Sequence, residues 1–226
     1  MEEIGELIVE SHDYYLLKNK ISEVLQELHR QFQWFNEEEL EETPRRLTQF
    51  YIDWAKKSHA DFKFTTFPVR GKASLITIKN LEFASVCGHH VLPFTGKVSI
   101  AYLPFDEDMG GVYGGLSKFA RAVEKFTRKP QTQEVMTQEL TDYLWNHLGY
   151  SNTNGDEHLK EDSEFVANPK FLFVLVKDAT HTCTTIRGPE QHNPEMGTDG
   201  MRWDSNYLSA EDVKSLREEA MRVLLG

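Results

Sequence analysis

The order of two hydrophobic periodicities constrains the fold of this chain more than any other sequence feature. Apolar residues recur at helical spacing over residues 15–35 and again over residues 43–58. Between Ile76 and Tyr102 apolar and polar residues instead alternate, as they do in half-buried antiparallel strands. Helical patterns return after these strands. Helices followed by strands and by further helices predict an α+β fold.

Local signals predict where individual helices begin. Thr43 followed by Pro44 is typical of an N-cap residue with proline in the first helical position. Ser117 is expected to cap the next helix, and another helix is predicted to start near residues 131–132. Ser209 opens a predicted C-terminal helix with a capping pattern. These signals divide the helical parts of the chain into separate elements.

The remaining segments divide into strand and loop. The continuous apolar run 171–176 predicts a buried strand. The acidic, glycine-rich segment 106–115 and the polar segment 151–169 predict exposed loops. We therefore expect an N-terminal helical region over residues 1–60 and one larger domain over residues 61–226.

The charge balance argues against one large class of function. Among 226 residues, 25 lysines and arginines stand against 36 aspartates and glutamates, which gives a net charge of −11. A broad basic surface for nucleic acid is therefore not expected, although a small basic pocket remains open. No stretch reaches the roughly 20 apolar residues of a membrane span, and the acidic start does not resemble a secretory leader. We expect a cytoplasmic protein without a membrane or nucleic-acid partner.

The two cysteines, Cys87 and Cys183, lie far apart in the sequence. They exclude a disulfide framework and leave either a single bridge or a shared metal. The motif Cys87-Gly88-His89-His90 favours the metal, because thiolate and imidazole are ligands that zinc prefers. Cys87, one of the two histidines and Cys183 would supply three protein ligands. The fourth coordination position of the zinc would then stay open for a reacting water. The alternative is a hydrogen-bonded histidine pair beside a free buried cysteine.

Two further groups of side chains carry candidate chemistry. His181 lies two residues before Cys183, on the same face if the segment is extended, and its imidazole could move protons near neutral pH. A strand-end histidine bonded to backbone is the alternative. Lys118, Arg121 and Lys125 share one helix face and could hold an anion together with the backbone amides of the helix start. The same spacing also fits a solvated helix face.

Several separately spaced segments carry a family resemblance. They are SVCGHHVLPF over residues 85–94, GLSKFAR over 115–121, PQTQE over 130–134, HTCTTIRG over 181–188, and ETPRR over 42–46. Taken in this order, they resemble the GTP cyclohydrolase I family. Because the agreement extends over independent motifs, the resemblance strengthens the zinc interpretation.

The resemblance implies a tunnelling fold, in which an antiparallel sheet carries helices packed on one face and an N-terminal helical arm precedes it. Residues 61–226 would form this catalytic domain, and copies would assemble into a homodecamer with sites at subunit interfaces. The family converts GTP and water to 7,8-dihydroneopterin triphosphate and formate, the reaction from which folate, biopterin and deazaguanine routes begin. Zinc activates the water that attacks C8 of the purine, formate leaves, and the pterin ring closes after an Amadori rearrangement.

Carried over position by position, the resemblance implies roles for the residues of the reacting centre. Cys87, His90 and Cys183 would be the zinc ligands, and His89 and His181 would be the catalytic histidines. Zinc fits the reaction because it lowers the pKa of a bound water to about 7. We expect His181 to make the main proton transfer in ring opening.

The resemblance also implies the residues that bind the substrate. Glu134, supported by Gln133, would bind the guanine edge, since a carboxylate can accept from both N1–H and the 2-amino group. The residues that would hold the ribose and the triphosphate are Ser117, Lys118, Arg121, Arg187 and Arg46.

The chain departs from the family pattern at several places. Gly88 stands where the family commonly has glutamate, and Gln49 where it has a second phosphate-binding lysine. Segments 105–113 and 151–169 are longer than usual, and 189–207 does not match the family's Thr/Ser-rich end. These departures leave open a diverged cyclohydrolase that acts on another guanine nucleotide or stops at a ring-opened intermediate. A catalytically silent zinc-binding assembly and a cysteine-nucleophile enzyme are the alternatives from other classes.

Overall fold

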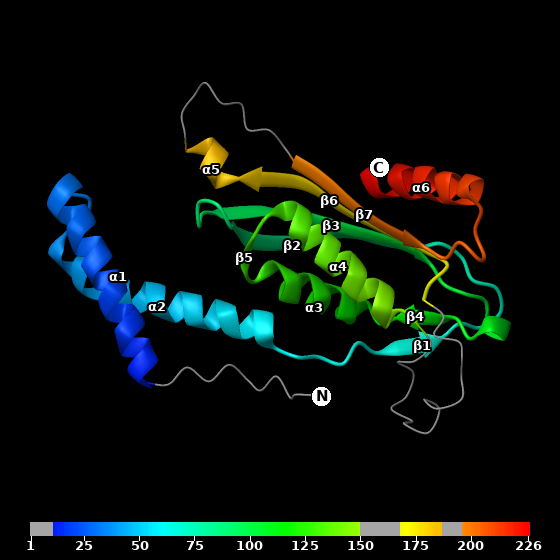
Figure 1. Cartoon of the computed structure of the whole chain (residues 1–226), viewed down its shortest axis with the longest axis horizontal. Coiled ribbons are helices and arrows are strands. Elements are labelled where there is room, and N and C mark those ends of the chain that lie inside the picture. Colours follow the sequence, from blue (N-terminus) through cyan, green and yellow to red (C-terminus); the bar gives the residue numbers. More distant parts are fainter. Residues whose placement is uncertain (1–10, 150–167, 187–195) are drawn as a thin grey trace. The chain divides into compact units, whose positions relative to one another are not determined.

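The computed structural model describes residues 11–149, 168–186 and 196–226 (Figure 1). The chain divides into two compact units, Met1–Asp61 and Phe62–Gly226. In the described residues, the first unit consists of two helices that pack against each other, α1 (Ser11–Phe32) and α2 (Glu37–His59). No helix of the described residues is long and apolar enough to cross a membrane.

The start of α2 corrects one prediction. A helix start at Thr43 and Pro44 is wrong, because a capping box farther upstream begins the helix. The Asn36 side chain accepts from the Glu39 N–H at 2.8 Å, and the Glu39 carboxylate accepts from the Asn36 N–H at 2.9 Å. Pro44 is buried inside the helix, where its missing N–H removes one backbone hydrogen bond.

The second unit is built on a β-sheet. The strands of this unit are β1 (Thr66–Pro68), β2 (Ile76–Cys87), β3 (Pro93–Leu103), β4 (Val112–Gly114), β5 (Pro130–Gln131), β6 (Phe171–His181) and β7 (Met196–Trp203). Five of them form one sheet in the order β5-β2-β3-β6-β7 (Figure 1). β5 runs parallel to β2, and the other neighbours in this sheet are antiparallel. β1 and β4 form a separate antiparallel ladder.

Helices cover both faces of this sheet. α3 (Leu116–Thr127) and α4 (Gln133–His147) pack on one face, and the C-terminal α6 (Ala210–Leu225) packs on the other (Figure 1). The predicted α+β class, with a mainly antiparallel sheet and helices on a face, is therefore confirmed, and α6 adds cover on the opposite face.

The central strand β6 shows how the two faces are filled. Leu172, Val174 and Val176 join the core under α3 and α4, whereas Phe171 and Phe173 join the core under α6. All five side chains are fully buried. Because this strand is covered on both sides, its sequence is continuously apolar rather than alternating, as the buried-strand prediction required.

The helix starts in this unit partly follow the predictions, which are a start near residues 131–132, a Ser117 cap and a capped start at Ser209. The side chain of Thr132 accepts from the backbone at the start of α4, and Ser209 forms a capping box with Asp212 at the start of α6. Both predictions are confirmed. The Ser117 cap is wrong, because Gly115 is the N-cap of α3 and no side-chain cap forms there. Pairing of β4 with β1 extends to Gly114, so the helix starts before Ser117 is reached.

Two segments predicted as loops, or left without an account, contain regular structure. Segment 106–115 holds a short 3-10 helix, η1 (Glu107–Met109), and the strand β4. In segment 189–207, residues 196–203 form β7, which pairs with β6 along the sheet edge. Residues 151–167 of the predicted exposed excursion lie outside the described residues.

Candidate active site

A tight turn between β2 and β3 shapes the first half of the site. Cys87 ends β2, and its backbone N–H donates to Leu92 O at 2.8 Å while its carbonyl accepts from Val91 N–H at 2.9 Å. Val91 adopts φ of 55°, a left-handed conformation unusual for a β-branched residue. This closed turn brings His90 Nδ1 to 3.8 Å from Cys87 Sγ.

The second half of the site comes from the end of β6. After His181 the chain turns into the short helix α5 (Thr182–Thr185). His181 and Cys183 therefore do not share one face of an extended strand, which is the arrangement expected for an extended segment. The Thr182 hydroxyl donates to Pro93 O at 2.6 Å, and the Thr184 hydroxyl donates to His181 O at 2.7 Å. These bonds fix the start of α5. Cys183, the second residue of this helix, thereby faces Cys87 and His90 in the β2–β3 turn.

The three side chains Cys87, His90 and Cys183 form a cluster that could bind a metal ion, because their ligand atoms all lie within 4.8 Å of one another. Zinc with bonds of about 2.3 Å to sulfur and about 2.0 Å to nitrogen at a tetrahedral angle needs a sulfur–nitrogen separation of about 3.5 Å. The 3.8 Å between Cys87 and His90 is close to that value. Both the donor types and their spacing fit such an ion.

His181 lies beside this cluster and is held on two sides. Its ring stacks on Phe94 with centroids 4.3 Å apart and planes at 4°, and its Nε2 lies 3.1 Å from Gln133 Oε1. Burial lowers the pKa of His181 below its ordinary value, and the negative charge of Glu134 acts in the opposite direction. The imidazole is a group that can take up and release a proton.

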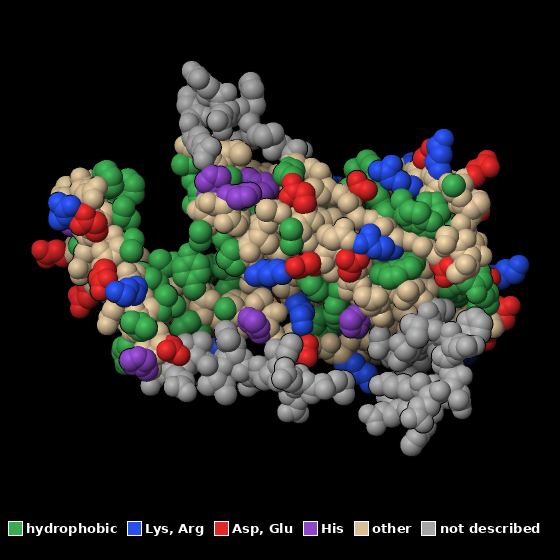
Figure 2. Space-filling model, viewed as in Figure 1, with side chains coloured by type: hydrophobic (Ala, Val, Ile, Leu, Met, Phe, Trp, Pro, Cys, Tyr) green, Lys and Arg blue, Asp and Glu red, His purple; other side chains and the backbone are tan. Residues whose placement is uncertain are grey.

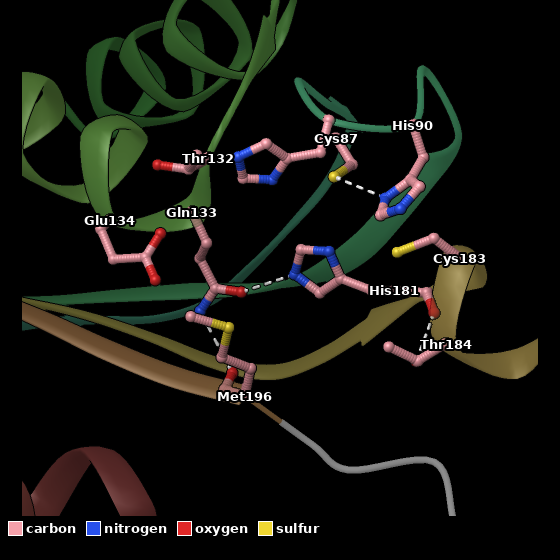
Figure 3. A pocket seen from close by; sticks show the side chains of 10 residues that line it. Cys87, His90, Thr132, Gln133, Glu134, His181, Cys183, Thr184 and Met196 are labelled. Atoms are coloured by element: carbon pink, nitrogen blue, oxygen red, sulfur yellow. Dashed lines mark hydrogen bonds between the residues drawn. The ribbon is translucent and has the colours of Figure 1, made fainter. Parts of the chain in front are cut away.

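The first turn of α4 forms another wall of the same pocket. Gln133 is 1% exposed and points inward, whereas Glu134 is exposed to the pocket side (Figure 3). His89 lines this pocket as well. Histidine side chains gather on the surface at the end of the sheet where α5 lies (Figure 2).

The pocket therefore unites part of the predicted site. One pocket is lined by both predicted catalytic histidines, the three predicted metal ligands, and the two predicted guanine-binding residues Gln133 and Glu134. Arg187 lies outside the described residues. Arg46 lies exposed on α2 in the other unit, where it is 4.0 Å from Glu42.

The predicted phosphate-binding residues of α3 do not line this pocket. α3 and α4 are antiparallel neighbours, since Lys129, just after α3, contacts Glu139 at 2.5 Å and Phe126 contacts Tyr143 with ring centroids 5.1 Å apart. A helix of the length of α4 spans about 22 Å. The first turns of α3 and α4 therefore lie at opposite ends of the pair, and Ser117, Lys118 and Arg121 lie on the first turns of α3.

Sequence reasoning missed several pocket residues. Thr184 and Met196 line the pocket, and Thr198 on β7 contacts the Gln133 side chain. β7 contains two glycines and few β-branched residues, so its sequence gave no strand signal. The motif HTCTT contained Thr184, but nothing in that motif marked it as a pocket residue.

A sulfur and imidazole cluster beside a titratable histidine, on a mainly antiparallel sheet flanked by helices, defines a candidate metalloenzyme. Comparison with known proteins identifies which kind. Residues 17–153 match the family model described as GTP cyclohydrolase I, and the chain belongs to this family.

Individual relatives agree with the family match. A protein of Lysinibacillus sphaericus (strain C3-41) named GTP cyclohydrolase 1 is 34% identical over 155 residues, which cover 68% of this chain and 69% of the relative. A GTP cyclohydrolase 1 of Streptococcus pyogenes serotype M3 (strain ATCC BAA-595 / MGAS315) is 37% identical over 155 residues, 68% of each chain. One from Aquifex aeolicus (strain VF5) is 32% identical over 190 residues, 84% of this chain and 86% of the relative.

Proposed function

We propose that this chain is a zinc-dependent GTP cyclohydrolase I, which converts GTP and water to 7,8-dihydroneopterin triphosphate and formate. The observation that carries the proposal is one pocket that combines a cysteine and histidine cluster, a stacked histidine and a carboxylate. Family membership supplies the reaction, and this pocket supplies side chains suited to it.

In this proposal Cys87, His90 and Cys183 hold the zinc ion. Zinc bound there supplies a Lewis acid that makes water nucleophilic at neutral pH. The cluster leaves room for a fourth ligand, because the described part of the chain supplies three side chains and the cluster opens into the pocket. His89, on the same turn as His90, completes the set of histidines around the reacting carbon.

Glu134 binds the guanine edge in this proposal. Its carboxylate is exposed in the first turn of α4 and can accept hydrogen bonds from N1–H and from the 2-amino group. The partial positive charge at the start of α4 favours a carboxylate at this position. His181 moves the proton during ring opening, and its stacking on Phe94 keeps the imidazole in one orientation.

The triphosphate is held by Ser117, Lys118 and Arg121 together with Arg46 and Arg187. Because the first turn of α3 lies at the far end from the pocket of the same chain, we propose that two copies build each site. The pocket of one copy then faces α3 of another copy in a homo-oligomer, and a homodecamer satisfies this arrangement for every copy.

The direct test incubates purified, zinc-replete protein with GTP, measures formate and identifies the product by mass spectrometry. Dihydroneopterin triphosphate with one formate per GTP supports the proposal. Bound zinc and a stable oligomer without turnover would instead favour a catalytically silent assembly.

A complementation experiment tests the shared site. The Cys183→Ser variant lacks a metal ligand, and the double variant Lys118→Gln/Arg121→Gln lacks phosphate contacts. Co-expression with two different tags isolates mixed oligomers, in which a site can combine an intact pocket with an intact α3. Mixed oligomers more active than either parent support sharing, and mixed oligomers as inactive as the parents would contradict it.

A second candidate rests on Gly88. Its backbone N–H donates to Gln131 O at 2.9 Å, and a Cβ added there would make only ordinary contacts with the Gln131 backbone, at 3.4 Å or more. Space therefore does not explain the missing side chain. A diverged cyclohydrolase that uses another guanine nucleotide or stops at a ring-opened intermediate fits this change. Comparing GTP, dGTP, GMP and guanosine as substrates separates the two candidates.

A further inference from the structure

A chain of hydrogen bonds lies behind His181 and connects it to two threonines. Gln133 Oε1 lies 3.1 Å from His181 Nε2, and Gln133 Nε2 lies 3.2 Å from Met196 O and 3.0 Å from Thr198 Oγ1. The Thr198 hydroxyl lies 2.7 Å from the Thr137 hydroxyl, which lies 2.8 Å from the backbone oxygen of Gln133. Gln133 and Thr137 are almost completely buried.

The direction of each hydrogen bond follows from its two ends. A backbone carbonyl can only accept, so the Thr137 hydroxyl donates its one hydrogen to Gln133 O. Thr137 Oγ1 is then an acceptor toward Thr198, and the Thr198 hydroxyl must donate to it. The oxygen of Thr198 therefore accepts from Gln133.

The orientation of the Gln133 amide is fixed in the same way. Met196 O can only accept, so the group that faces it must be the NH₂ of Gln133. Both N–H bonds of this amide are then used, one on Met196 O and one on Thr198 Oγ1. The carbonyl oxygen of the amide faces the imidazole.

An amide oxygen facing Nε2 requires a hydrogen on Nε2. The neutral tautomer of His181 is therefore Nε2–H, and Nδ1 carries the lone pair. The ring nitrogen that is not bonded to Gln133 lies on the side of the ring toward Cys87, His90 and Cys183 (Figure 3). The nitrogen able to take a proton thus faces the reacting centre.

We propose that Thr198 and Thr137 are positioning residues that, through Gln133, hold His181 as the Nε2–H tautomer and leave Nδ1 to exchange the proton with the substrate. The role in the reaction rests on the proposed function. The lone pair of Nδ1 takes the proton and the imidazolium returns it, while Nε2–H keeps its bond to Gln133. The Gln133 side chain acts on the imidazole and not on guanine, because neither N–H bond of its amide is left for a base.

Three variants test the role of the Thr198 hydroxyl. Thr198→Val keeps the shape and removes the hydroxyl, so the Gln133 amide keeps only Met196 O as an acceptor and is held less firmly against His181. We expect kcat to fall about 10-fold to 100-fold, with KM within about 2-fold, because proton transfer follows binding. Thr198→Ser restores the hydroxyl and should recover most of kcat.

Thr141→Val is the matched control. Thr141 is a buried threonine on α4, one turn beyond Thr137, and its hydroxyl donates to a backbone oxygen of its own helix at 2.7 Å. Its kcat should equal that of the wild type, and zinc content should be the same in all variants. Wild-type kcat in Thr198→Val would overturn the proposal. The proposal would also be overturned if Thr198→Ser or Thr141→Val lost as much kcat as Thr198→Val.

A spectroscopic measurement decides the tautomer without turnover. Magic-angle-spinning NMR of zinc-replete protein labelled with ¹⁵N-histidine distinguishes the tautomers at pH 8, and His181→Ala identifies the signal. We expect Nε2–H in the wild type and a mixture in Thr198→Val. A wild-type Nδ1–H signal would overturn the proposal even in an active enzyme. Failure to release formate would contradict only the proposed function, because the tautomer is measured independently.

Discussion

The two helices on one face of the sheet, α3 and α4, begin in opposite ways. The first turn of α4 is capped by Thr132, buries Gln133 and lines the pocket with Glu134. α3 has Gly115 as its N-cap without a side-chain cap, and its first two turns carry exposed Ser117 and Arg121. The candidate side chains at the start of α4 line the chain's own pocket, whereas Ser117 and Arg121 at the start of α3 are exposed outside it.

Under the proposed function, this difference separates two kinds of site residue. Side chains proposed to react, or to orient a reacting group, are fixed by contacts within one chain. The hydrogen bond and the ring stacking that hold His181 illustrate this. Under the proposed function, the cations of α3 bind the charged triphosphate in the pocket of another copy and need no such contacts within their own chain. Variants in the two places should therefore have different effects. Pocket variants should lose zinc or kcat, whereas α3 variants should lose affinity for the substrate.

Cys183→Ser should have the largest effect. A serine hydroxyl is a poor zinc ligand, so the cluster keeps two good ligands and loses the ion. We expect zinc to fall well below one ion per chain and formate release to fall at least about 1,000-fold. Metal analysis by mass spectrometry and a formate assay measure both. Stoichiometric zinc in this variant would remove Cys183 from the ligand set.

His181→Ala should reduce turnover without removing the metal. General acid and base groups contribute about 100-fold to 10,000-fold, and kcat should fall within that range. Zinc content and oligomer size should stay unchanged, because the ring contacts Phe94 and Gln133 and is not part of the Cys87, His90 and Cys183 cluster. Turnover at the wild-type rate would exclude His181 from the mechanism.

Arg121→Gln should weaken affinity while leaving the pocket intact. A charge-assisted contact to phosphate contributes about 1.5 to 3 kcal/mol, so KM for GTP should rise about 10-fold to 100-fold. Arg217→Gln is the matched control, because Arg217 lies on α6 on the opposite face and contacts Asp199 at 3.5 Å. Loss of zinc in Arg121→Gln would contradict the idea that the start of α3 acts on substrate affinity alone.

Glu134→Gln should change selectivity more than turnover. The carboxylate can accept from two guanine N–H groups, whereas an amide accepts with one oxygen and turns its NH₂ toward a donor. The preference for GTP over ITP, which lacks the 2-amino group, should fall about 10-fold in kcat/KM. Glu139→Gln on the same helix is the control, since Glu139 contacts Lys129 instead. An unchanged preference would contradict the base contact.

Helix starts also show which parts of the fold could be predicted from the sequence. The caps at Thr132 and Ser209 were predictable because each depends on contacts within a few residues. The capping box of Asn36 and Glu39 is equally local, so the true start of α2 could be predicted, and Thr43-Pro44 is the misleading signal. The start of α3 could not be predicted, because the pairing of β4 with β1, far apart in the sequence, precedes it.

The candidate site shows the same limit. The residues Cys87, His90, His181 and Cys183 came from motifs, and the structure brings them to one pocket. The bond from Gln133 to Thr198 joins residues 65 positions apart, and no local pattern announces it. The orientation of the His181 imidazole therefore depends on contacts that form only in the folded sheet.

The smallest effect concerns a third helix start, which is capped but carries no part of the site. At α6 the Ser209 hydroxyl and backbone N–H donate to the Asp212 carboxylate, and these bonds hold the pKa of Asp212 below its ordinary value. A carboxylate with a lowered folded pKa stabilises the protein above its unfolded value of about 4, and this contribution is lost as pH falls through the folded value. Asp212→Asn should therefore be less stable than the wild type at pH 7.

This stability difference should shrink as pH falls from 5 to 3, since asparagine does not titrate there. The urea midpoint of both proteins, measured across this range, reports it. At pH 7 kcat should be unchanged, because α6 lies on the face of the sheet opposite α4. A difference in midpoint that does not depend on pH would contradict the role of the ionised carboxylate. A fall in kcat would instead mean that the cap of α6 is coupled to the pocket through the sheet, and a helix start outside the site would then influence it.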